Sequence, residues 1–197
     1  MTRPTTTTTT TGADLPLVAL PQTELLTVND NEIPWLEESL APGVKIKPLR
    51  LDVEAGIWVI MAAFEPGSRV PLHYHTGEAE VFTLSGRWNY LEYPDQPQTA
   101  GSYLYEPAGS VHTLDVPADN TEDTLMFIRV RGANVNFRDD GTFHSILDAA
   151  ALVFLTDLFS DQVGTDMRYI RGGDTAYVVA GGGDATLPPA IAEALDR

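Results

Sequence analysis

The chain has 197 residues, no cysteine and a formal net charge of −16 at neutral pH. This length suits one domain with a sizeable core, and the lack of cysteine excludes disulfides and thiolate metal sites. The acidic balance argues against nucleic acid and anionic membrane surfaces as partners, because like charges repel. No apolar stretch is long enough for a transmembrane helix. The apolar run at 15–20 is a poor signal peptide, because it is short and broken by Pro16. We therefore expect a cytoplasmic protein.

The two ends of the chain are expected to lie outside the folded domain. Residues 1–20 include a threonine run at 5–11. Because such a run has little apolar surface to bury, a disordered tail is predicted there. Residues 173–197 contain Gly181-Gly182-Gly183 and are predicted to form a glycine-rich tail. Residues 21–172 remain for a single domain.

Between these ends the sequence alternates short strand-like segments with turns. The strand candidates, in chain order, are 44–52, 56–64, 80–84, 87–93, 102–106 and 124–131. Short strands at this spacing, with glycine and proline turns between them, predict a β-sandwich or β-barrel. A helix is predicted near 145–160, where the apolar positions are too numerous for an exposed helix. We expect it to pack on the barrel or at a subunit interface.

Three of the four histidines lie in two short segments. The first segment, 67–75, ends in His73-Tyr74-His75. In an extended strand His73 and His75 point to the same face, so their imidazoles can hold one metal ion. The second segment, 101–112, can bring His112 to the same place from a neighbouring strand. The fourth histidine, His144, precedes the predicted helix and is expected at the surface rather than on a metal.

The two segments resemble the motifs of the cupin family, Gly-x5-His-x-His-x3–4-Glu-x6-Gly and Gly-x5-Pro-x-Gly-x2-His. The matching positions are Gly67, His73, His75 and Gly86 in the first motif, and Gly101, Pro107, Gly109 and His112 in the second. The resemblance implies an all-β, single-domain cupin, which is a double-stranded β-helix or jelly-roll barrel, here with a C-terminal helix and flexible tails. It also implies a metal at the centre of the barrel. Only one His-x-His segment is present, so no internal duplication is expected.

The first motif does not decide which glutamate supplies the carboxylate ligand. The cupin pattern has three or four residues between the second histidine and a glutamate, which corresponds to positions 79 and 80; the sequence has Ala79 there, flanked by Glu78 and Glu80. Glu80 satisfies the longer spacing but leaves five residues before Gly86 instead of six.

Glu92 is a further candidate, in the run Tyr90-Leu91-Glu92. Together with Trp88 and Tyr105-Glu106-Pro107, this run resembles a narrower branch, the 2,4'-dihydroxyacetophenone dioxygenase and ChrR-like cupins. In that branch the glutamate of this run is a metal ligand. The resemblance therefore implies four metal ligands: His73, His75, Glu92 and His112. Glu80 and Glu78 are the alternatives to Glu92.

The same resemblance implies a non-haem iron dioxygenase that uses O2 to cleave a C–C bond of a small ketone substrate. The substrate class is an aryl hydroxyketone such as 2,4'-dihydroxyacetophenone, or a related dicarbonyl. Fe(II) is the expected metal, although imidazoles also suit Zn, Mn and Ni. The alternatives are a ChrR-like metal- or ligand-binding regulatory cupin and an O2-independent cupin isomerase, because one fold hosts many functions. A homo-oligomer, either a dimer or a tetramer, is expected.

Overall fold

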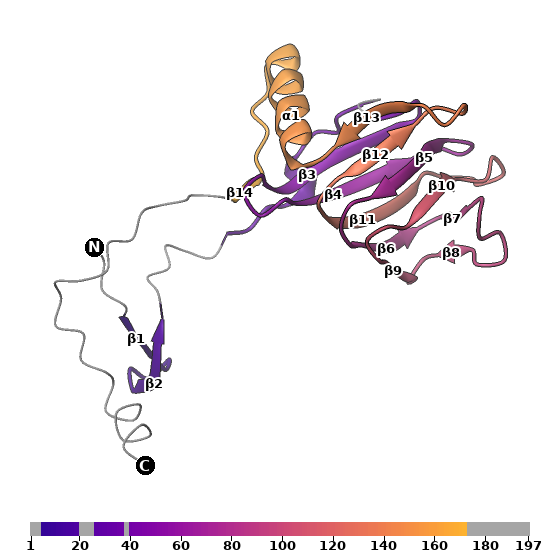
Figure 1. Cartoon of the computed structure of the whole chain (residues 1–197). Coiled ribbons are helices and arrows are strands. Elements are labelled where there is room, and N and C mark those ends of the chain that lie inside the picture. Colours follow the sequence, from indigo (N-terminus) through magenta and orange to yellow (C-terminus); the bar gives the residue numbers. More distant parts are fainter. Residues whose placement is uncertain (1–4, 20–25, 38–39, 173–197) are drawn as a thin grey trace. The chain divides into compact units, whose positions relative to one another are not determined.

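The computed structural model describes residues 5–19, 26–37 and 40–172. The chain divides into two compact units, one of Met1–Leu26 with Thr175–Arg197 and one of Thr27–Asp174. In the first unit, strands β1 (Thr5–Thr8) and β2 (Asp14–Ala19) form an antiparallel hairpin (Figure 1). The sequence predicts a disordered tail here, but threonine is β-branched and favours extended backbone. The predicted tail at 173–197 lies outside the described residues.

The second unit is built from two six-stranded sheets. One sheet has the order β14-β3-β4-β11-β6-β9, formed by Ile170–Gly172, Val44–Asp52, Ile57–Phe64, Thr124–Arg131, Ala79–Ser85 and Tyr103–Glu106. The other has the order β13-β12-β5-β10-β7-β8, formed by Phe143–Leu147, Asn134–Phe137, Arg69–His75, Val111–Asp115, Arg87–Tyr90 and Gln98–Thr99. This is the predicted all-β cupin architecture.

The two sheets face each other (Figure 1), and the core draws on residues of both of them. On β4, Trp58, Ile60 and Ala62 are buried while Ile57, Val59 and Met61 are partly exposed, which follows the alternation of side chains along a strand. Trp88 of β7 and Leu114 of β10 enter the same cluster from the facing sheet. One side of each sheet thus forms the barrel interior, where inward-pointing polar side chains become site candidates.

The β6–β7 turn shows why the first cupin motif ends in glycine. Gly86 has a positive φ of 78°, and a Cβ at this position would collide with Thr124. Glycine has no Cβ and adopts this conformation readily. The turn delivers β7 to the sheet that also carries the histidines.

Helix α1 (Ala149–Val163) follows β13 and packs beside β3 and β13 (Figure 1). It starts later than the predicted 145–160 because residues 143–147 form a strand. The Asp148 side chain accepts a hydrogen bond from the Ala151 N–H, which caps the first turn, and Gly164 ends the helix with φ 64°. The contacts of α1 with β3 and β13 agree with one of the two predicted placements, packing on the barrel. A 3-10 helix spans Asp30–Glu32; neither helix of the described residues combines the length and apolar character needed to cross a membrane.

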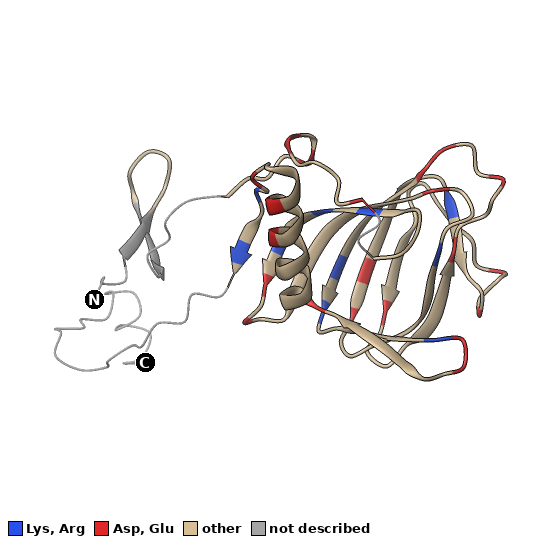
Figure 2. Ribbon diagram, turned by 90° about the horizontal axis from the view of Figure 1, so that it is seen from above, with Lys and Arg blue, Asp and Glu red and all other residues tan. Residues whose placement is uncertain are grey.

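Charged residues are distributed unevenly over this unit. Figure 2 shows basic positions on several strands and acidic positions in loops and on α1. Surface ion pairs join some of them, such as Lys45 with Asp123 at 2.9 Å and Arg69 with Asp115 at 2.6 Å. The full sequence has 28 acidic and 12 basic residues, so acidic side chains outnumber basic ones.

Candidate metal centre

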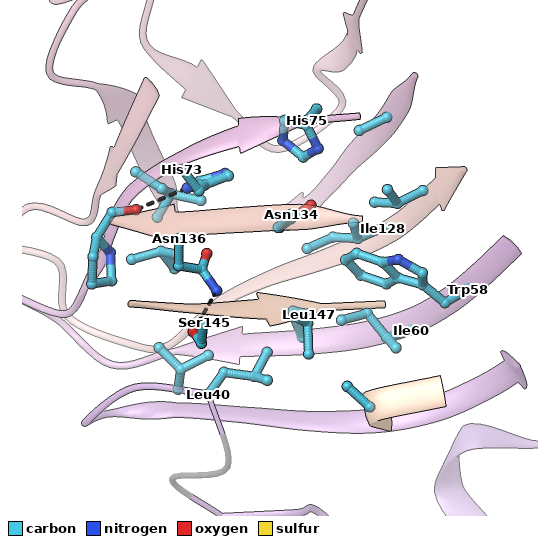
Figure 3. A pocket seen from close by; sticks show the side chains of 18 of the residues that line it. Leu40, Trp58, Ile60, His73, His75, Ile128, Asn134, Asn136, Ser145 and Leu147 are labelled. Atoms are coloured by element: carbon cyan, nitrogen blue, oxygen red, sulfur yellow. Dashed lines mark hydrogen bonds between the residues drawn. The ribbon is translucent and has the colours of Figure 1, made fainter. Parts of the chain in front are cut away.

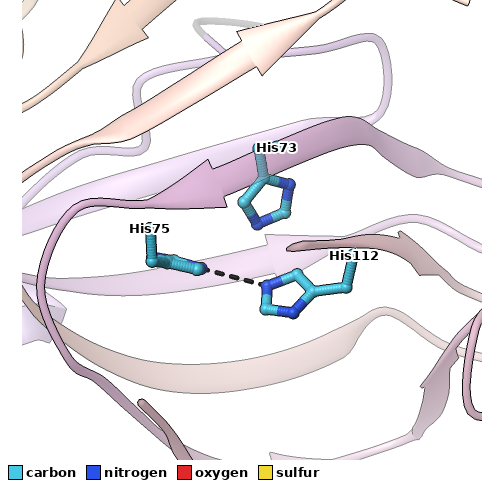
Figure 4. Close-up of side chains that lie close together, drawn as sticks. All are labelled: His73, His75 and His112. Atoms are coloured by element: carbon cyan, nitrogen blue, oxygen red, sulfur yellow. Dashed lines mark hydrogen bonds between the residues drawn. The ribbon is translucent and has the colours of Figure 1, made fainter. Parts of the chain in front are cut away.

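Three histidines converge inside the barrel. His73 and His75 lie on β5, and His112 lies on β10 directly opposite His73. All three are buried, with exposed fractions of 2–4%. Each offers a ring nitrogen, and these atoms all lie within 4.8 Å of one another. Figure 4 shows the rings turned toward a common point, so the structure brings together the three histidines that the motifs single out.

His73 is held in one tautomer. Its Nδ1 lies 2.8 Å from the carbonyl oxygen of Pro71. A carbonyl only accepts, so Nδ1 carries the proton and donates it, which leaves the Nε2 lone pair free for a ligand. Burial, the largest cause, lowers the pKa of His73 to about 4. The ring is therefore neutral at neutral pH, the state that a metal ligand needs.

The carboxylate beside the histidines is Glu106, the last residue of β9. Its Oε2 lies 2.9 Å from His75 Nε2 and 3.2 Å from His112 Nε2, and the two nitrogens are 3.0 Å apart. Its Oε1 accepts a short hydrogen bond from the Tyr90 hydroxyl. The Tyr90 ring stacks on His112, with centroids 3.8 Å apart and planes 15° from parallel. Tyr90 thus holds both the carboxylate and one imidazole.

The geometry of these groups fits a divalent metal ion. Metal–ligand bonds of about 2.1 Å place two ligand atoms about 3.0 Å apart at a right angle and about 3.4 Å apart in a tetrahedron. The triangle of Glu106 Oε2, His75 Nε2 and His112 Nε2 has sides of 2.9–3.2 Å, which matches neighbouring corners of an octahedron. Glu106 Oε2 is also buried without a hydrogen-bond partner. A cation between these atoms would satisfy that oxygen.

The protonation states of Glu106 and Tyr90 support the same arrangement. Burial raises the pKa of Glu106, but the adjacent His112 and His75 outweigh it and lower the pKa well below its usual range. Burial, and then the negative Glu106, raise the pKa of Tyr90 well above its ordinary value. The carboxylate is therefore ionised, and the phenol keeps the proton that it donates.

A cavity of about 420 Å³ adjoins the cluster. Most of its wall is apolar, with Trp58, Ile60 and Ile128 among the lining residues labelled in Figure 3. Its polar groups lie at the histidines and along β12 and β13, where Asn136 Nδ2 donates to Ser145 Oγ at 3.0 Å. His73, His75 and Glu106 thus face a pocket of the size that holds a small organic molecule.

The family model described as the ChrR cupin-like domain matches residues 23–133. The chain belongs to this family of cupins. A cupin-like protein of unknown function from Ralstonia eutropha JMP134 is 40% identical, with 81% of this chain and 99% of that chain covered and a TM-score of 0.75. An RmlC-like cupin from the same organism is 23% identical, with 74% and 92% covered and a TM-score of 0.69.

An acetylacetone dioxygenase from Acinetobacter johnsonii also resembles this cupin. It is 19% identical, with 69% of this chain and 92% of that chain covered, and the TM-score is 0.58. At such identity the likeness concerns the fold alone. No curated protein matches the chain.

Glu92 does not lie where the resemblance to the dioxygenase branch places it. Its Oε2 accepts from the Thr113 N–H at 2.8 Å and its Oε1 from the Thr113 hydroxyl at 2.9 Å. Both oxygens of this exposed carboxylate therefore brace the strand that carries His112 instead of joining the histidine cluster. The expectation assumed a strand continuing through residue 92, but β7 ends at Tyr90. Without that strand, Glu92 no longer shares the inward face of Trp88.

The two rival glutamates also lie elsewhere. Glu78 and Glu80 approach Arg129 at 3.6 and 3.4 Å, whereas Ala79 between them is buried on β6. Glu106 was missed because the cupin pattern names no carboxylate at this position. The signal that points to it is the alternation along β9, which turns Glu106 inward just before Pro107.

His144 lies outside the histidine cluster, as expected. It is an exposed residue of β13 that also lines the cavity. Its Nδ1 lies 2.8 Å from Ser145 Oγ, which in turn accepts from Asn136. A chain of hydrogen bonds thus runs from the outside of this cupin into the pocket wall.

The metal-free protein is expected to lose stability as the pH falls from 7.5 to 5. The unfolded state protonates His73 below pH 6.5, whereas the folded state resists protonation down to about pH 4. Because the unfolded state then binds more protons, the free energy of unfolding drops, by about 2 kcal/mol at pH 5 from this residue. Urea unfolding of metal-free protein across this range measures the loss.

The matched variants are His73→Leu and His144→Leu. His73→Leu should flatten the pH dependence, while His144→Leu, at an exposed position, should keep the wild-type slope. Equal slopes in wild type and His73→Leu would contradict the prediction.

Proposed function

We propose that this cupin is a metal-dependent dioxygenase that cleaves a C–C bond of a small aryl hydroxyketone or dicarbonyl. The observation that carries the proposal is one buried site that combines a ligand set with a substrate-sized apolar cavity. Support also comes from the fold likeness to an acetylacetone dioxygenase, an enzyme named for a dicarbonyl substrate.

The proposed ligands are His73, His75, His112 and Glu106. Three neutral imidazoles and one carboxylate leave a divalent ion with a net positive charge, which favours an anionic, chelating oxygen pair such as an ionised hydroxyketone. The ligands are nitrogen and oxygen, which suits Fe(II). When bound, Fe(II) would supply the redox chemistry with O2 that side chains lack.

The protein's own part is to hold and orient the ketone. The apolar wall, including Trp58 and Ile128, excludes water and fits the flat face of an aromatic ring. On the β13 wall, the Ser145 hydroxyl would hydrogen-bond a polar substituent of that ring. Tyr90 holds Glu106 in position through its short hydrogen bond. The substrate's oxygens would therefore face the histidines while its ring lies in the apolar part of the cavity.

Oxygen uptake tests the proposal. Protein loaded anaerobically with Fe(II) is mixed with 2,4'-dihydroxyacetophenone, with 2-hydroxyacetophenone or with acetylacetone, and O2 and products are followed. For the first ketone we expect one O2 consumed per molecule, with 4-hydroxybenzoate and formate formed in equal amounts. The zinc-loaded protein and His75→Ala serve as controls and should consume no O2.

A regulatory module is the second candidate, favoured by the match to the ChrR cupin-like domain. The same assay separates the two functions. Absence of oxygen uptake on all of these ketones, combined with tightly retained zinc in freshly purified protein, would contradict the dioxygenase and support a metal-binding regulator.

A further inference from the structure

Besides Glu106 Oε2, two buried polar atoms of the cavity lining have no hydrogen-bond partner. They are His75 Nδ1 and Asn134 Oδ1. Their residues lie on the paired strands β5 and β12, where Asn134 is directly opposite His75. Both are buried, with exposed fractions of 3% and 8%, and both line the cavity (Figure 3). Because folded proteins rarely leave buried polar atoms unpaired, the coincidence on one cross-strand pair calls for a physical reason.

Metal binding would impose one tautomer on His75. Its Nε2 is the nitrogen that faces Glu106 Oε2 and His112 Nε2, at 2.9 and 3.0 Å. If Nε2 gives its lone pair to a metal, the single proton of the neutral ring must reside on Nδ1. A buried Nδ1–H then requires an acceptor, which a metal-binding histidine usually finds in a carboxylate, a carbonyl or a water.

His73 and His75 differ in this respect. His73 Nδ1 already donates to the Pro71 carbonyl, whereas His75 Nδ1 has no partner. The side-chain oxygen of Asn134 only accepts hydrogen bonds, and it is the unpaired acceptor facing His75 across the strands. Side chains at facing positions have Cβ atoms about 5 Å apart, so small side-chain rotations bring donor and acceptor into contact.

We propose that Asn134 is a positioning residue for the metal centre. Its Oδ1 accepts a hydrogen bond from His75 Nδ1–H in the metal-bound protein, and this bond fixes both the tautomer and the orientation of the ring. The inference rests on the proposed metal ligation by His75 and goes beyond it, because it assigns a role to a residue that follows the matched cupin segment.

Zinc affinity tests this role without any turnover. The dissociation constant for Zn²⁺ is measured by competition with a chromophoric chelator for wild type, Asn134→Leu, Asn134→Asp and Asn136→Leu. Asn134→Leu removes the acceptor and should weaken zinc binding on the order of 10- to 100-fold. Asn134→Asp keeps an acceptor oxygen at the same place and should restore the affinity to about the wild-type value or better.

Asn136→Leu is the matched control. Asn136 lies on the same strand, two residues away, and faces His73, whose Nδ1 is already paired. Its loss should leave the zinc affinity within about threefold of wild type, since no metal-binding nitrogen depends on it. Asn134→Ala provides the same comparison if Asn134→Leu does not fold, as judged by circular dichroism of the metal-free protein.

Nitrogen-15 NMR of the histidine rings supplies a readout that a purely structural role would not move. In zinc-bound wild type, His75 should show a protonated Nδ1 in slow exchange with water, and Asn134→Leu should lose that slow exchange. Unweakened zinc binding by Asn134→Leu, beside a zinc-binding wild type, would overturn the positioning role alone. No zinc binding by the wild type would overturn the proposed metal centre and the positioning role together.

Discussion

Glu106→Gln is expected to weaken metal binding by on the order of 100-fold or more. The substitution keeps the size of the side chain and an acceptor for the Tyr90 hydroxyl. It removes the negative charge that lies 2.9 and 3.2 Å from the two imidazole nitrogens. A divalent ion would lose its one anionic ligand, and each tenfold change in affinity corresponds to about 1.4 kcal/mol. Metal content after purification and chelator competition measure the effect.

Glu92→Gln is the control for this experiment. The Glu92 side chain binds Thr113 through both oxygens, so its replacement should leave metal affinity unchanged and reduce stability by about 1 kcal/mol. Metal loss in Glu92→Gln together with full retention in Glu106→Gln would instead restore the assignment made from the Tyr90-Leu91-Glu92 run.

Trp88→Ala should have the largest effect on stability. Trp88 is fully buried, its Nε1 donates to Thr83 Oγ1 at 2.9 Å, and its ring meets that of Tyr90 edge to face at 5.1 Å. Removing the ring leaves a large cavity and an unpaired hydroxyl, which together should lower the free energy of unfolding by about 3–5 kcal/mol. Urea unfolding of the metal-free protein measures it.

Tyr105→Ala, at a position that is 56% exposed, serves as the control and should change the free energy of unfolding by less than about 0.5 kcal/mol. A loss below about 1 kcal/mol in Trp88→Ala would contradict the assignment of Trp88 to the core. Because Tyr90 packs on both Trp88 and His112, the same variant should also bind metal more weakly.

The sequence predicts the fold and the histidine cluster well because both depend on local rules. Alternation on one strand places His73 and His75 on the same face, and the glycine-delimited motifs bring in His112. Local alternation did not predict the position of Glu92 correctly. Its predicted role assumed that a strand continues for two more residues, and strand ends are set by tertiary pairing that a local pattern does not contain.

The positions of Glu106 and Asn134 also depend on strand pairing, which local rules do not predict. Glu106 becomes a neighbour of the histidines only through the pairing of β9 with β6 and the closure of the barrel. Asn134 gains its place opposite His75 from the pairing of β12 with β5, which joins residues distant in sequence. The low apolar content of residues 5–19 predicts a tail, but the strand propensity of threonine favours the hairpin that is observed there.

The pocket wall formed by β12, β13 and α1 comes from a later stretch of chain than the three histidines. The match to the family model ends at residue 133, whereas Asn134, Ser145 and Phe154, which line the cavity, follow it. The later segment thus completes a pocket wall that Trp58, Ile60 and Ile128 begin. Substitutions at Ser145 or Phe154 would change the shape of the pocket while the three histidines and Glu106 stay untouched, and one fold can serve different ligands in this way.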